Sequence, residues 1–418
     1  MSGNLIKNRK AILVAGQSNT FWARQFGEAP VATGELDLSI KQLGRHNQDN
    51  LVPTNAGLTN IHFQQADGVR TGYAYPLAKA IKDEIECDEL LIVPCAIGGT
   101  GWSNKYWTAD GTLYQDMIAR IRYTVEVLGY EFVGAFWSQG ESDANATFSP
   151  IWHHLLHGLI STIRTVAYNA GQPNAHTIPF VTFDMVEAWV GNDPNRRAIQ
   201  NALEEVGSVV PYTGNANTTN LPANLELDTI HYDTRQLLEI GNRMFSAWQT
   251  AKTNDIPNAY ATAGETIVYH RNFGQYYSNI WQALESGSSP SNARYSRLGE
   301  LWRYENHGKY KFKLEWVISG KTNNIIWEQN FIPHFAVQLM SAASLISFSS
   351  GAIFGGNEQM GFNGLVFDTR RNTLIKLNSG VDWWVPLGQI TRFNGGIPIS
   401  NIHGVKLASE VTLSVIKS

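Results

Sequence analysis

Two hydrophobic periods alternate along the first 250 residues of the chain. Short apolar runs, which are typical of strands buried in a parallel sheet, occupy residues 11–15, 90–94, 132–137 and 178–183. Longer amphipathic stretches between them predict helices over residues 73–85, 113–128, 152–167, 196–206 and 234–251. Strands that alternate with helices predict a three-layer α/β fold, in which helices cover both faces of a parallel sheet. Ligands of such sheets bind at the carboxyl ends of the strands.

The pattern changes near residue 250. Residues 253–263 are predicted to form a linker between a first domain, residues 1–252, and a second domain, residues 264–418. Within the second domain, residues 309–316 alternate charged and apolar side chains, as in a half-buried antiparallel strand, and residues 365–377 predict a hairpin. We therefore expect this domain to be β-rich and sandwich-like. It is also mildly basic, because from residue 260 on it has 14 Lys and Arg against 10 Asp and Glu.

Composition narrows the class of protein. Only 16% of the 418 residues are charged and 11% are aromatic, which excludes a disordered chain and a coiled coil. The net charge of -4 argues against a nucleic-acid partner. Low charge with many aromatics fits either a large packed core or a protein that binds neutral polar ligands such as sugars. Residues 1–10 lack an apolar signal core, and no run approaches the length of a membrane span. We therefore expect a soluble protein with no membrane partner, either made in the cytoplasm or with its leader removed.

The strongest chemical signal follows the first apolar run. The strand predicted over residues 11–15 leads directly into Gly16-Gln17-Ser18-Asn19. A serine at the carboxyl end of a strand is exposed where backbone amides of the next turn can face an anion. The alternative is an ordinary turn in which Ser18 caps a helix.

Three further segments repeat this arrangement. Gly98-Gly99-Thr100 follows the strand over residues 90–94, and Gln139-Gly140-Glu141-Ser142-Asp143 follows the strand over residues 132–137. Asp228 and His231 stand three residues apart, just before the helix predicted over residues 234–251. Small residues in such loops allow the backbone to approach a ligand closely.

Together the four segments resemble the motifs of the SGNH hydrolase superfamily, and more closely those of its sialate O-acetylesterase-like (SASA) carbohydrate esterases. The resemblance spans roughly residues 8–248 and implies an SGNH-hydrolase-like three-layer domain that removes O-acetyl groups from a carbohydrate. The usual superfamily asparagine of the third motif is replaced by Gln139, a replacement that the SASA-like branch shares.

The residues support this chemistry. Ser18 is the expected nucleophile, and His231 is the expected base, because a serine hydroxyl is a poor nucleophile without one. Asp228 is expected to hold the imidazole in the required tautomer. Glu141 is an alternative orienting carboxylate, although a structural hydrogen-bonding role suits it better. The alternative for His231 is a surface histidine before a helix.

An oxyanion hole and a sugar site are expected beside these residues. The backbone amides of Ser18 and of Gly99 or Gly98, with the side chain of Gln139, are the expected oxyanion donors. The aromatic side chains that follow the glycine loop are expected either to stack on a sugar ring or to pack as a lid: Trp102, Tyr106 and Trp107. His153 and His157 have metal-ligand spacing but lack an accompanying carboxylate, so we expect no metal and no cofactor.

The second domain carries six of the thirteen tryptophans: 281, 302, 316, 327, 383 and 384. It is expected to bind carbohydrate or only to form oligomers. Residues 310–331 faintly resemble C-terminal modules of phage tailspike and tail-fibre proteins, which implies a homotrimer, a virion tail component, acting on acetylated bacterial surface polysaccharide. Two alternatives remain, a lipase or thioesterase of the same fold and a catalytically silent glycan-binding adhesin.

Overall fold

The protein forms two compact units, Met1–Leu156 with Ile163–Ile256 and His157–Thr162 with Pro257–Ser418. The predicted linker spans the boundary at residue 256, and its residues 257–263 lie outside the described part of the chain. The computed structural model describes residues 8–20, 23–24, 37–43, 58–60, 70–108, 111–223, 228–256, 264–272, 287–292, 294–296, 298, 301, 304, 310–329, 344–348, 362–367, 375–379, 384–387, 397–401, 404–408 and 410–417.

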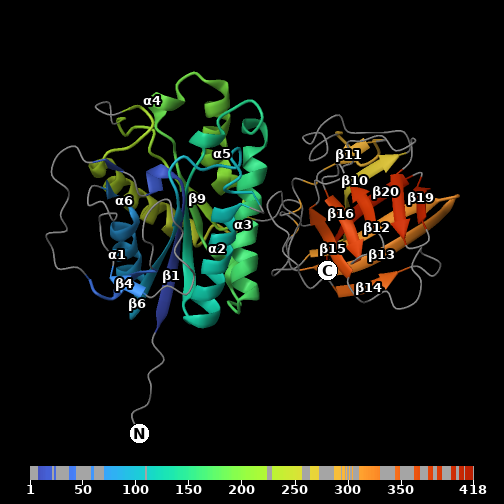
Figure 1. Ribbon diagram of the computed structural model, residues 1–418, viewed down its shortest axis with the longest axis horizontal. Helices are drawn as coiled ribbons and strands as arrows, with labels where there is room; N and C mark the ends of the chain where they lie inside the picture. The colour runs from blue at the N-terminus through green and yellow to red at the C-terminus, as the bar shows by residue number, and fades with distance from the viewer. Residues whose placement is uncertain are drawn as a thin grey trace, which may run out of the picture. The chain divides into compact units, whose positions relative to one another are not determined.

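A seven-stranded sheet lies at the centre of the first unit (Figure 1). Six strands are parallel, and the edge strand β4 is antiparallel to β3. All four strands predicted from apolar runs are present, whereas β3, β4 and β9 were not predicted. In spatial order the strands are β4 (Leu58–Asn60), β3 (Ile40–Leu43), β6 (Glu89–Ala96), β1 (Arg9–Gly16), β7 (Glu131–Ser138), β8 (Phe180–Phe183) and β9 (Thr213–Ala216).

Helices cover both faces of this sheet, which confirms the three-layer α/β prediction. In Figure 1, α1 (Ala74–Ile85) and α6 (Thr234–Ala251) lie on one face, and α2 (Thr112–Arg122) and α3 (Trp152–Asn169) lie on the other. The first face is apolar because alternate strand residues point to it: Ile12 and Val14 share one buried cluster with Leu77, Ile81 and Leu237. The remaining helices are α4 (Glu187–Val190) and α5 (Pro194–Val209).

The order of the strands reverses at β1. Its neighbours β6 and β7 follow each other in the chain but pair with opposite edges of β1. Loops that leave the carboxyl ends of neighbouring parallel strands at such a point diverge and leave a crevice. A 3-10 turn, Ser18–Thr20, follows β1, and a short ribbon of β2 (Ala23–Arg24) with β5 (Arg70–Thr71) comes after it.

Gly16 lets the end of β1 approach β7 closely. It has a φ of +131°, and a Cβ atom at this position would lie 2.0 Å from the carbonyl oxygen of Ser138. The same approach permits the backbone N–H of Gln17 to donate to Ser138 O at 2.7 Å. The glycine of the first motif is therefore required by packing immediately before Ser18.

The second unit consists of antiparallel sheets, as predicted. The prediction for residues 309–316 is confirmed by β12, in which Tyr310, Phe312, Leu314 and Trp316 are buried at alternate positions. One sheet has the order β11 (Arg294–Ser296), β10 (Gly264–Asn272), β20 (Glu410–Lys417), β12 (Tyr310–Ile318), β13 (Lys321–Gln329) and β14 (Ser344–Phe348). The other has the order β15 (Phe362–Phe367), β16 (Ile375–Ser379), β17 (Trp384–Leu387), β18 (Ile397–Asn401) and β19 (Gly404–Ala408).

Two tryptophans considered for carbohydrate binding belong to the core of this unit. Trp316 is 1% exposed and Trp327 is 0% exposed, so neither can stack on a sugar. Trp281, Trp302 and Trp383 lie outside the described residues.

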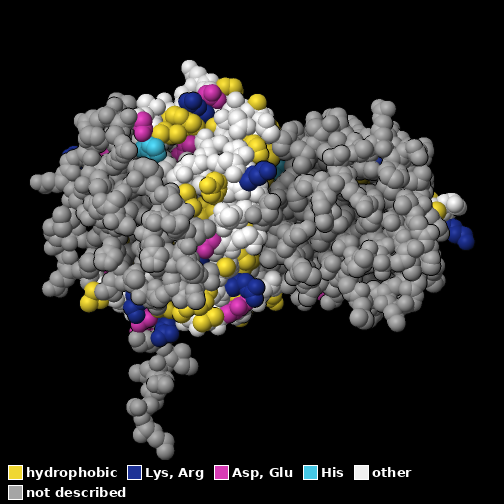
Figure 2. Space-filling view, in the orientation of Figure 1, with side chains coloured by type: hydrophobic (Ala, Val, Ile, Leu, Met, Phe, Trp, Pro, Cys, Tyr) yellow, Lys and Arg dark blue, Asp and Glu magenta, His cyan; other side chains and the backbone are white. Residues whose placement is uncertain are grey.

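The described surface is mixed in charge on the face that Figure 2 shows. Lys and Arg side chains lie among Asp and Glu side chains there rather than forming one patch of a single sign. Among the described residues, no helix is both long and apolar enough to cross a bilayer.

Replacing Gly16 with alanine should destabilise the protein by roughly 2–5 kcal/mol, because the new Cβ collides with β7 and the backbone is strained. Gly129→Ala is the matched control: its φ is +69°, but no atom lies within 4 Å of the added Cβ. This control should cost only about 1–2 kcal/mol. Urea unfolding of both variants measures the difference, and equal losses would show that the contact with Ser138 is unimportant.

Candidate active site

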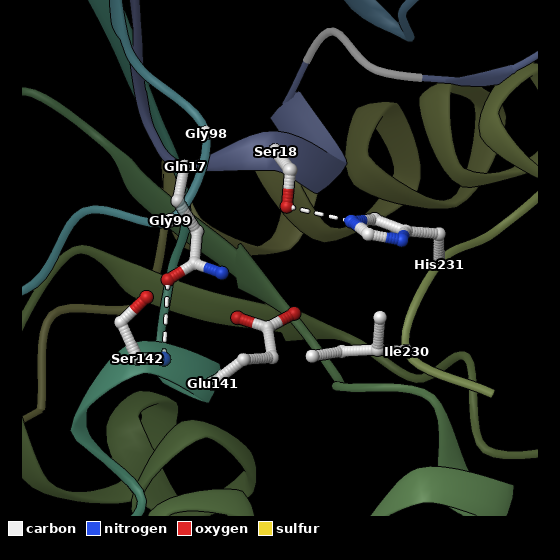
Figure 3. A pocket seen from close by; sticks show the side chains of 8 residues that line it. All are labelled: Gln17, Ser18, Gly98, Gly99, Glu141, Ser142, Ile230 and His231. Carbon is white, nitrogen blue, oxygen red and sulfur yellow. Dashed lines mark hydrogen bonds between the residues drawn. The ribbon is translucent and has the colours of Figure 1, made fainter. Parts of the chain in front are cut away.

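A pocket of 520 Å³ lies at the carboxyl edge of the central sheet (Figure 3). Each of the four sequence motifs contributes to it: residues after β1, β6 and β7, and the loop before α6. Its size is in the range of small-molecule sites. The lining residues are Gln17, Ser18, Gly98, Gly99, Glu141, Ser142, Ile230 and His231.

Ser18 stands at the start of the 3-10 turn that follows β1. The turn is closed by a hydrogen bond from the Thr20 N–H to the Gln17 carbonyl at 3.0 Å. Ser18 is buried except for 5% of its surface, and its hydroxyl points toward the imidazole of His231 (Figure 3). The Ser18 Oγ lies 2.9 Å from His231 Nε2.

Asp228 organises the loop that carries His231. Its Oδ1 accepts hydrogen bonds from the backbone N–H groups of Ile230 and His231, both at 2.9 Å, and its Oδ2 lies 2.8 Å from His231 Nδ1. The loop ends at a capping box, in which the side chain of Asp233 accepts from the Gln236 N–H to begin α6. One short segment thus positions both the imidazole and its carboxylate partner.

The carboxylate partner determines the tautomer of the imidazole. Partial burial acts to raise the pKa of Asp228, but the hydrogen bonds from His231 outweigh it and lower this pKa below its usual value. Asp228 is therefore ionised near neutral pH and can only accept, so the proton of a neutral imidazole resides on Nδ1. His231 Nε2 is then free to accept the proton of the Ser18 hydroxyl. This arrangement can activate a serine for attack on an acyl carbon.

Three residues that line the pocket have backbone donors without a partner. Among the residues that the structure describes, the N–H groups of Ser18, Gly98 and Gly99 have no hydrogen-bond acceptor. Gly99 has a φ of +73°, a conformation that favours glycine. These groups are available to a ligand, and the geometry leaves both glycines as candidates.

Gln139 does not lie where the sequence-based expectation placed it. It is 2% exposed and is not among the lining residues. Its Nε2 donates to Asp143 Oδ2 at 2.6 Å, and its Oε1 accepts from Trp152 Nε1 at 3.1 Å. Because both ends of the amide are occupied by buried partners, Gln139 links the loop after β7 to Trp152.

Two of the three expected sugar-stacking aromatics are also buried behind the pocket. Trp102 is 2% exposed and Trp107 is 0% exposed. The ring of Trp102 is tilted against that of Trp137, with the two ring centroids 5.8 Å apart, and the ring of Trp107 packs edge-on against it, with the centroids 4.6 Å apart. Trp107 Nε1 additionally donates to Thr100 Oγ1. They form the packed support of the glycine loop. Tyr106 is 38% exposed and does not line the pocket.

Glu141 lines the pocket without contacting His231 through a hydrogen bond. Its Oε1 accepts from Asn19 Nδ2 at 2.8 Å, while its Oε2 is buried without a partner among the described residues. Burial raises the pKa of Glu141 above its usual value, and the hydrogen bonds to its own backbone and from Asn19 only partly oppose this. Asp228, not Glu141, is the carboxylate that the structure places on the imidazole.

Four residues around Ser18 were not predicted from the sequence. Gln17, Ser142 and Ile230 line the pocket, and Asn19 links Glu141 to the loop of His231. The only available signal was their position inside the recognised motifs. The described part of the chain contains no group of three or more His, Cys, Asp or Glu arranged to hold a metal ion.

Replacing Glu141 with glutamine should change how stability depends on pH. The raised pKa means that the folded state prefers the protonated carboxyl of Glu141. The protonated carboxyl therefore contributes to the stability of the wild type at low pH, and this stabilisation is lost as pH rises through the folded-state pKa. Glutamine stays neutral throughout. The free energy of unfolding of Glu141→Gln, relative to that of the wild type, should therefore increase from pH 4 to pH 8. Chemical unfolding across this range measures it, and a constant or falling difference would contradict the pKa direction.

Part of this chain is similar to known proteins. A probable carbohydrate esterase of Arabidopsis thaliana, At4g34215, is 40% identical over 78 residues, which cover 18% of this chain and 28% of the relative. The chain therefore matches less than a third of that relative's length. Similar solved structures include NanS, with 18% identity and a TM-score of 0.45 over 58% of this chain and 98% of NanS. XAC1771, a carbohydrate acetylesterase from Xanthomonas citri, has 15% identity and a TM-score of 0.43. This match covers 82% of this chain and 72% of the XAC1771 chain.

The match to a family model is longer. The model described as carbohydrate esterase, sialic acid-specific acetylesterase matches residues 8–250, which include all four motifs and every residue that lines the pocket. The chain therefore belongs to the family of sialic acid-specific acetylesterase-like carbohydrate esterases.

Proposed function

We propose that the protein is a serine-dependent esterase that removes O-acetyl groups from a carbohydrate. The observation that carries the proposal is the continuous contact from Ser18 Oγ through His231 to Asp228, with separations of 2.9 and 2.8 Å, at the wall of a pocket. Membership of a carbohydrate esterase family supports the substrate class.

The reaction proceeds in two steps. Ser18 Oγ attacks the acetyl carbonyl carbon while its proton passes to His231 Nε2, and the backbone amides of Ser18 and of Gly99 or Gly98 stabilise the oxyanion. The carbon–oxygen bond to the sugar then breaks, and His231 returns the proton to the departing sugar hydroxyl. Water, deprotonated by the same imidazole, attacks the acetyl-serine, and acetate leaves as Ser18 regains its proton.

The lining of the pocket favours this substrate over a long-chain lipid or thioester. Among the described residues that line it, Ile230 alone has an apolar side chain. A lipase or thioesterase needs a long apolar groove for its acyl chain. A short acetyl group on a polar sugar matches a lining of glycine, amide, hydroxyl and carboxyl groups.

The polysaccharide and the assembly remain predictions from the sequence. Acetylated bacterial surface polysaccharide, a homotrimer and a role in a virion tail all rest on the resemblance of residues 310–331, of which residues 330–331 lie outside the described part of the chain. Acetate release measured across O-antigens, capsules, xylan and sialosides identifies the sugar.

Ser18→Ala should lower the hydrolysis of 4-nitrophenyl acetate by about 10⁴-fold or more, because no other group replaces the nucleophile. Ser208→Ala is a suitable control, since Ser208 is an exposed residue on α5. Both variants should melt like the wild type. Full activity of Ser18→Ala would overturn the proposal.

Labelling by an organophosphate serine probe separates an esterase from a silent glycan-binding adhesin. The wild-type protein should be modified at Ser18 with loss of activity, and Ser18→Ala should remain unmodified. An unlabelled wild-type protein that still binds acetylated glycan would support the adhesin. A tenfold preference for 4-nitrophenyl octanoate over the acetate would support the lipase.

A further inference from the structure

The side chain of Asn104 bridges the two ends of the turn Gly99-Thr100-Gly101. Its Nδ2 donates to the carbonyl of Gly99 at 2.7 Å, and its Oδ1 accepts from the N–H of Gly101 at 2.9 Å. A backbone N–H can only donate and a carbonyl can only accept, so these two partners fix the orientation of the amide. Asn104 is exposed and does not line the pocket, whereas Gly99 does. A surface amide is thus bound at both ends to the loop that lines the pocket of Ser18.

Among the described residues, little else holds Gly99. No atom lies within 4 Å of the place where a Cβ would be. The amide of Asn104 is the one described hydrogen-bond partner of its backbone. Glycine adopts many backbone conformations at little cost, and residue 98 before it is also a glycine. The direction of the Gly99 N–H therefore depends on the contact that Asn104 makes with the carbonyl of the same residue.

The segment that carries Asn104 is anchored from inside the fold. The carboxylate of Asp143, which is 0% exposed, accepts from the backbone N–H groups of Trp102 at 3.1 Å and of Ser103 at 2.8 Å. The N–H of Lys105 donates to the Trp102 carbonyl at 3.0 Å and closes a turn around Asn104. Lys105 has a φ of +68°, which is uncommon for a residue other than glycine. Asn104 therefore makes its two contacts from a backbone that is itself held in place.

We propose that Asn104 is a positioning residue for the oxyanion hole: by holding the carbonyl of Gly99, it directs the N–H of the glycine loop at the oxyanion of the transition state. The inference rests on the proposed function of the site. In Figure 3 the glycine loop and the imidazole of His231 lie to opposite sides of Ser18. Oxyanion donors stabilise the transition state most when they are already oriented before the reaction. Asn104 acts through Gly99, because its own side chain is outside the pocket.

Asn104→Asp separates the two hydrogen bonds of the amide. A carboxylate can still accept from the Gly101 N–H, but it cannot donate to the carbonyl of Gly99. Asn104→Ala removes both bonds. Each variant should lower kcat for 4-nitrophenyl acetate by roughly 10–100-fold, with KM changed by less than about threefold, because a misdirected donor weakens mainly the transition state. Asn104→Asp should be at least as slow as Asn104→Ala near pH 7, since its carboxylate repels the carbonyl oxygen.

The pH dependence of Asn104→Asp distinguishes positioning from a merely structural role. A protonated carboxyl can donate to the Gly99 carbonyl again, and the ordinary pKa of an aspartic acid is about 4. The ratio of kcat for Asn104→Asp to kcat for the wild type should therefore rise several-fold from pH 7 to pH 4. The same ratio for Asn104→Ala should stay constant, because alanine does not titrate.

Asn292→Ala is a matched control. Asn292 is an exposed asparagine of the second unit, and its Oδ1 accepts from the backbone N–H of Ser289 at 2.7 Å. Its loss also removes a side-chain amide that closes a turn. Both kcat and the melting temperature of this variant should equal those of the wild type.

The outcomes that contradict the inference are distinct from those that contradict the esterase. If both Asn104 variants keep kcat within about threefold of the wild type while Ser18→Ala is inactive, Asn104 does not position the oxyanion hole and the esterase proposal stands. If Asn104→Ala is slow but Asn104→Asp is as fast as the wild type at pH 7, the bond to Gly101 matters instead and the inference is wrong. If Ser18→Ala is fully active, the proposed function itself is wrong.

Melting temperatures identify an effect that comes only from folding. Because Asn104 is exposed, both variants should melt within a few degrees of the wild type. A large fall in melting temperature together with the fall in kcat, and no recovery of Asn104→Asp at pH 4, would overturn the inference.

Discussion

The buried side chain of Asn19 joins the three segments from which the pocket is built. Its Nδ2 donates to Glu141 Oε1 at 2.8 Å and to the carbonyl of Ile230 at 3.1 Å, while its Oδ1 accepts from the Tyr232 N–H at 3.3 Å. The amide thus connects the turn of Ser18 to the loop after β7 and to both neighbours of His231. This connection supports the 2.9 Å contact between Ser18 and His231, which joins the same turn to the same loop.

A second network holds the same loop from the far side. The carboxylate of Asp184, which follows β8, accepts from Asn215 Nδ2 and from the Thr218 N–H, both at 2.6 Å. The Tyr232 hydroxyl donates to the carbonyl of Asp184 and lies 2.9 Å from Thr218 Oγ1. Burial raises the pKa of Asp184, and these hydrogen bonds oppose that effect. The loop of His231 is therefore supported both by β1 and by the strands at the other edge of the sheet, which reduces its freedom to move away from Ser18.

Sequence periodicity predicted the helices and strands that are long and have a clear pattern of apolar residues. It missed short strands without such a pattern, which form by pairing with a neighbouring strand. β9 (Thr213–Ala216) has no apolar run, and it forms because β8 offers a parallel edge. That Ser18, Asp228 and His231 lie together was predictable because each stands at the end of a strand or before a helix in a recognised motif. That Gln17 lines the pocket and Gln139 does not was not predictable, since it depends on the buried partners Asp143 and Trp152 of the Gln139 amide. The sequence also left open whether Trp102 and Trp107 stack on a sugar or pack against the domain, because only the position of Trp137 shows that they are covered.

The two atoms of the proposed nucleophile and base belong to residues 213 positions apart. During synthesis the serine leaves the ribosome long before the histidine, and the chain between them includes every parallel strand that follows β1 in the central sheet. A serine hydroxyl without its base is nearly inert. Under the proposed mechanism, the nascent protein therefore carries a latent nucleophile that becomes reactive only when the loop before α6 docks. Under this mechanism, reactivity of this one hydroxyl reports that the strands between Ser18 and His231 have been synthesised and that the loop before α6 has docked.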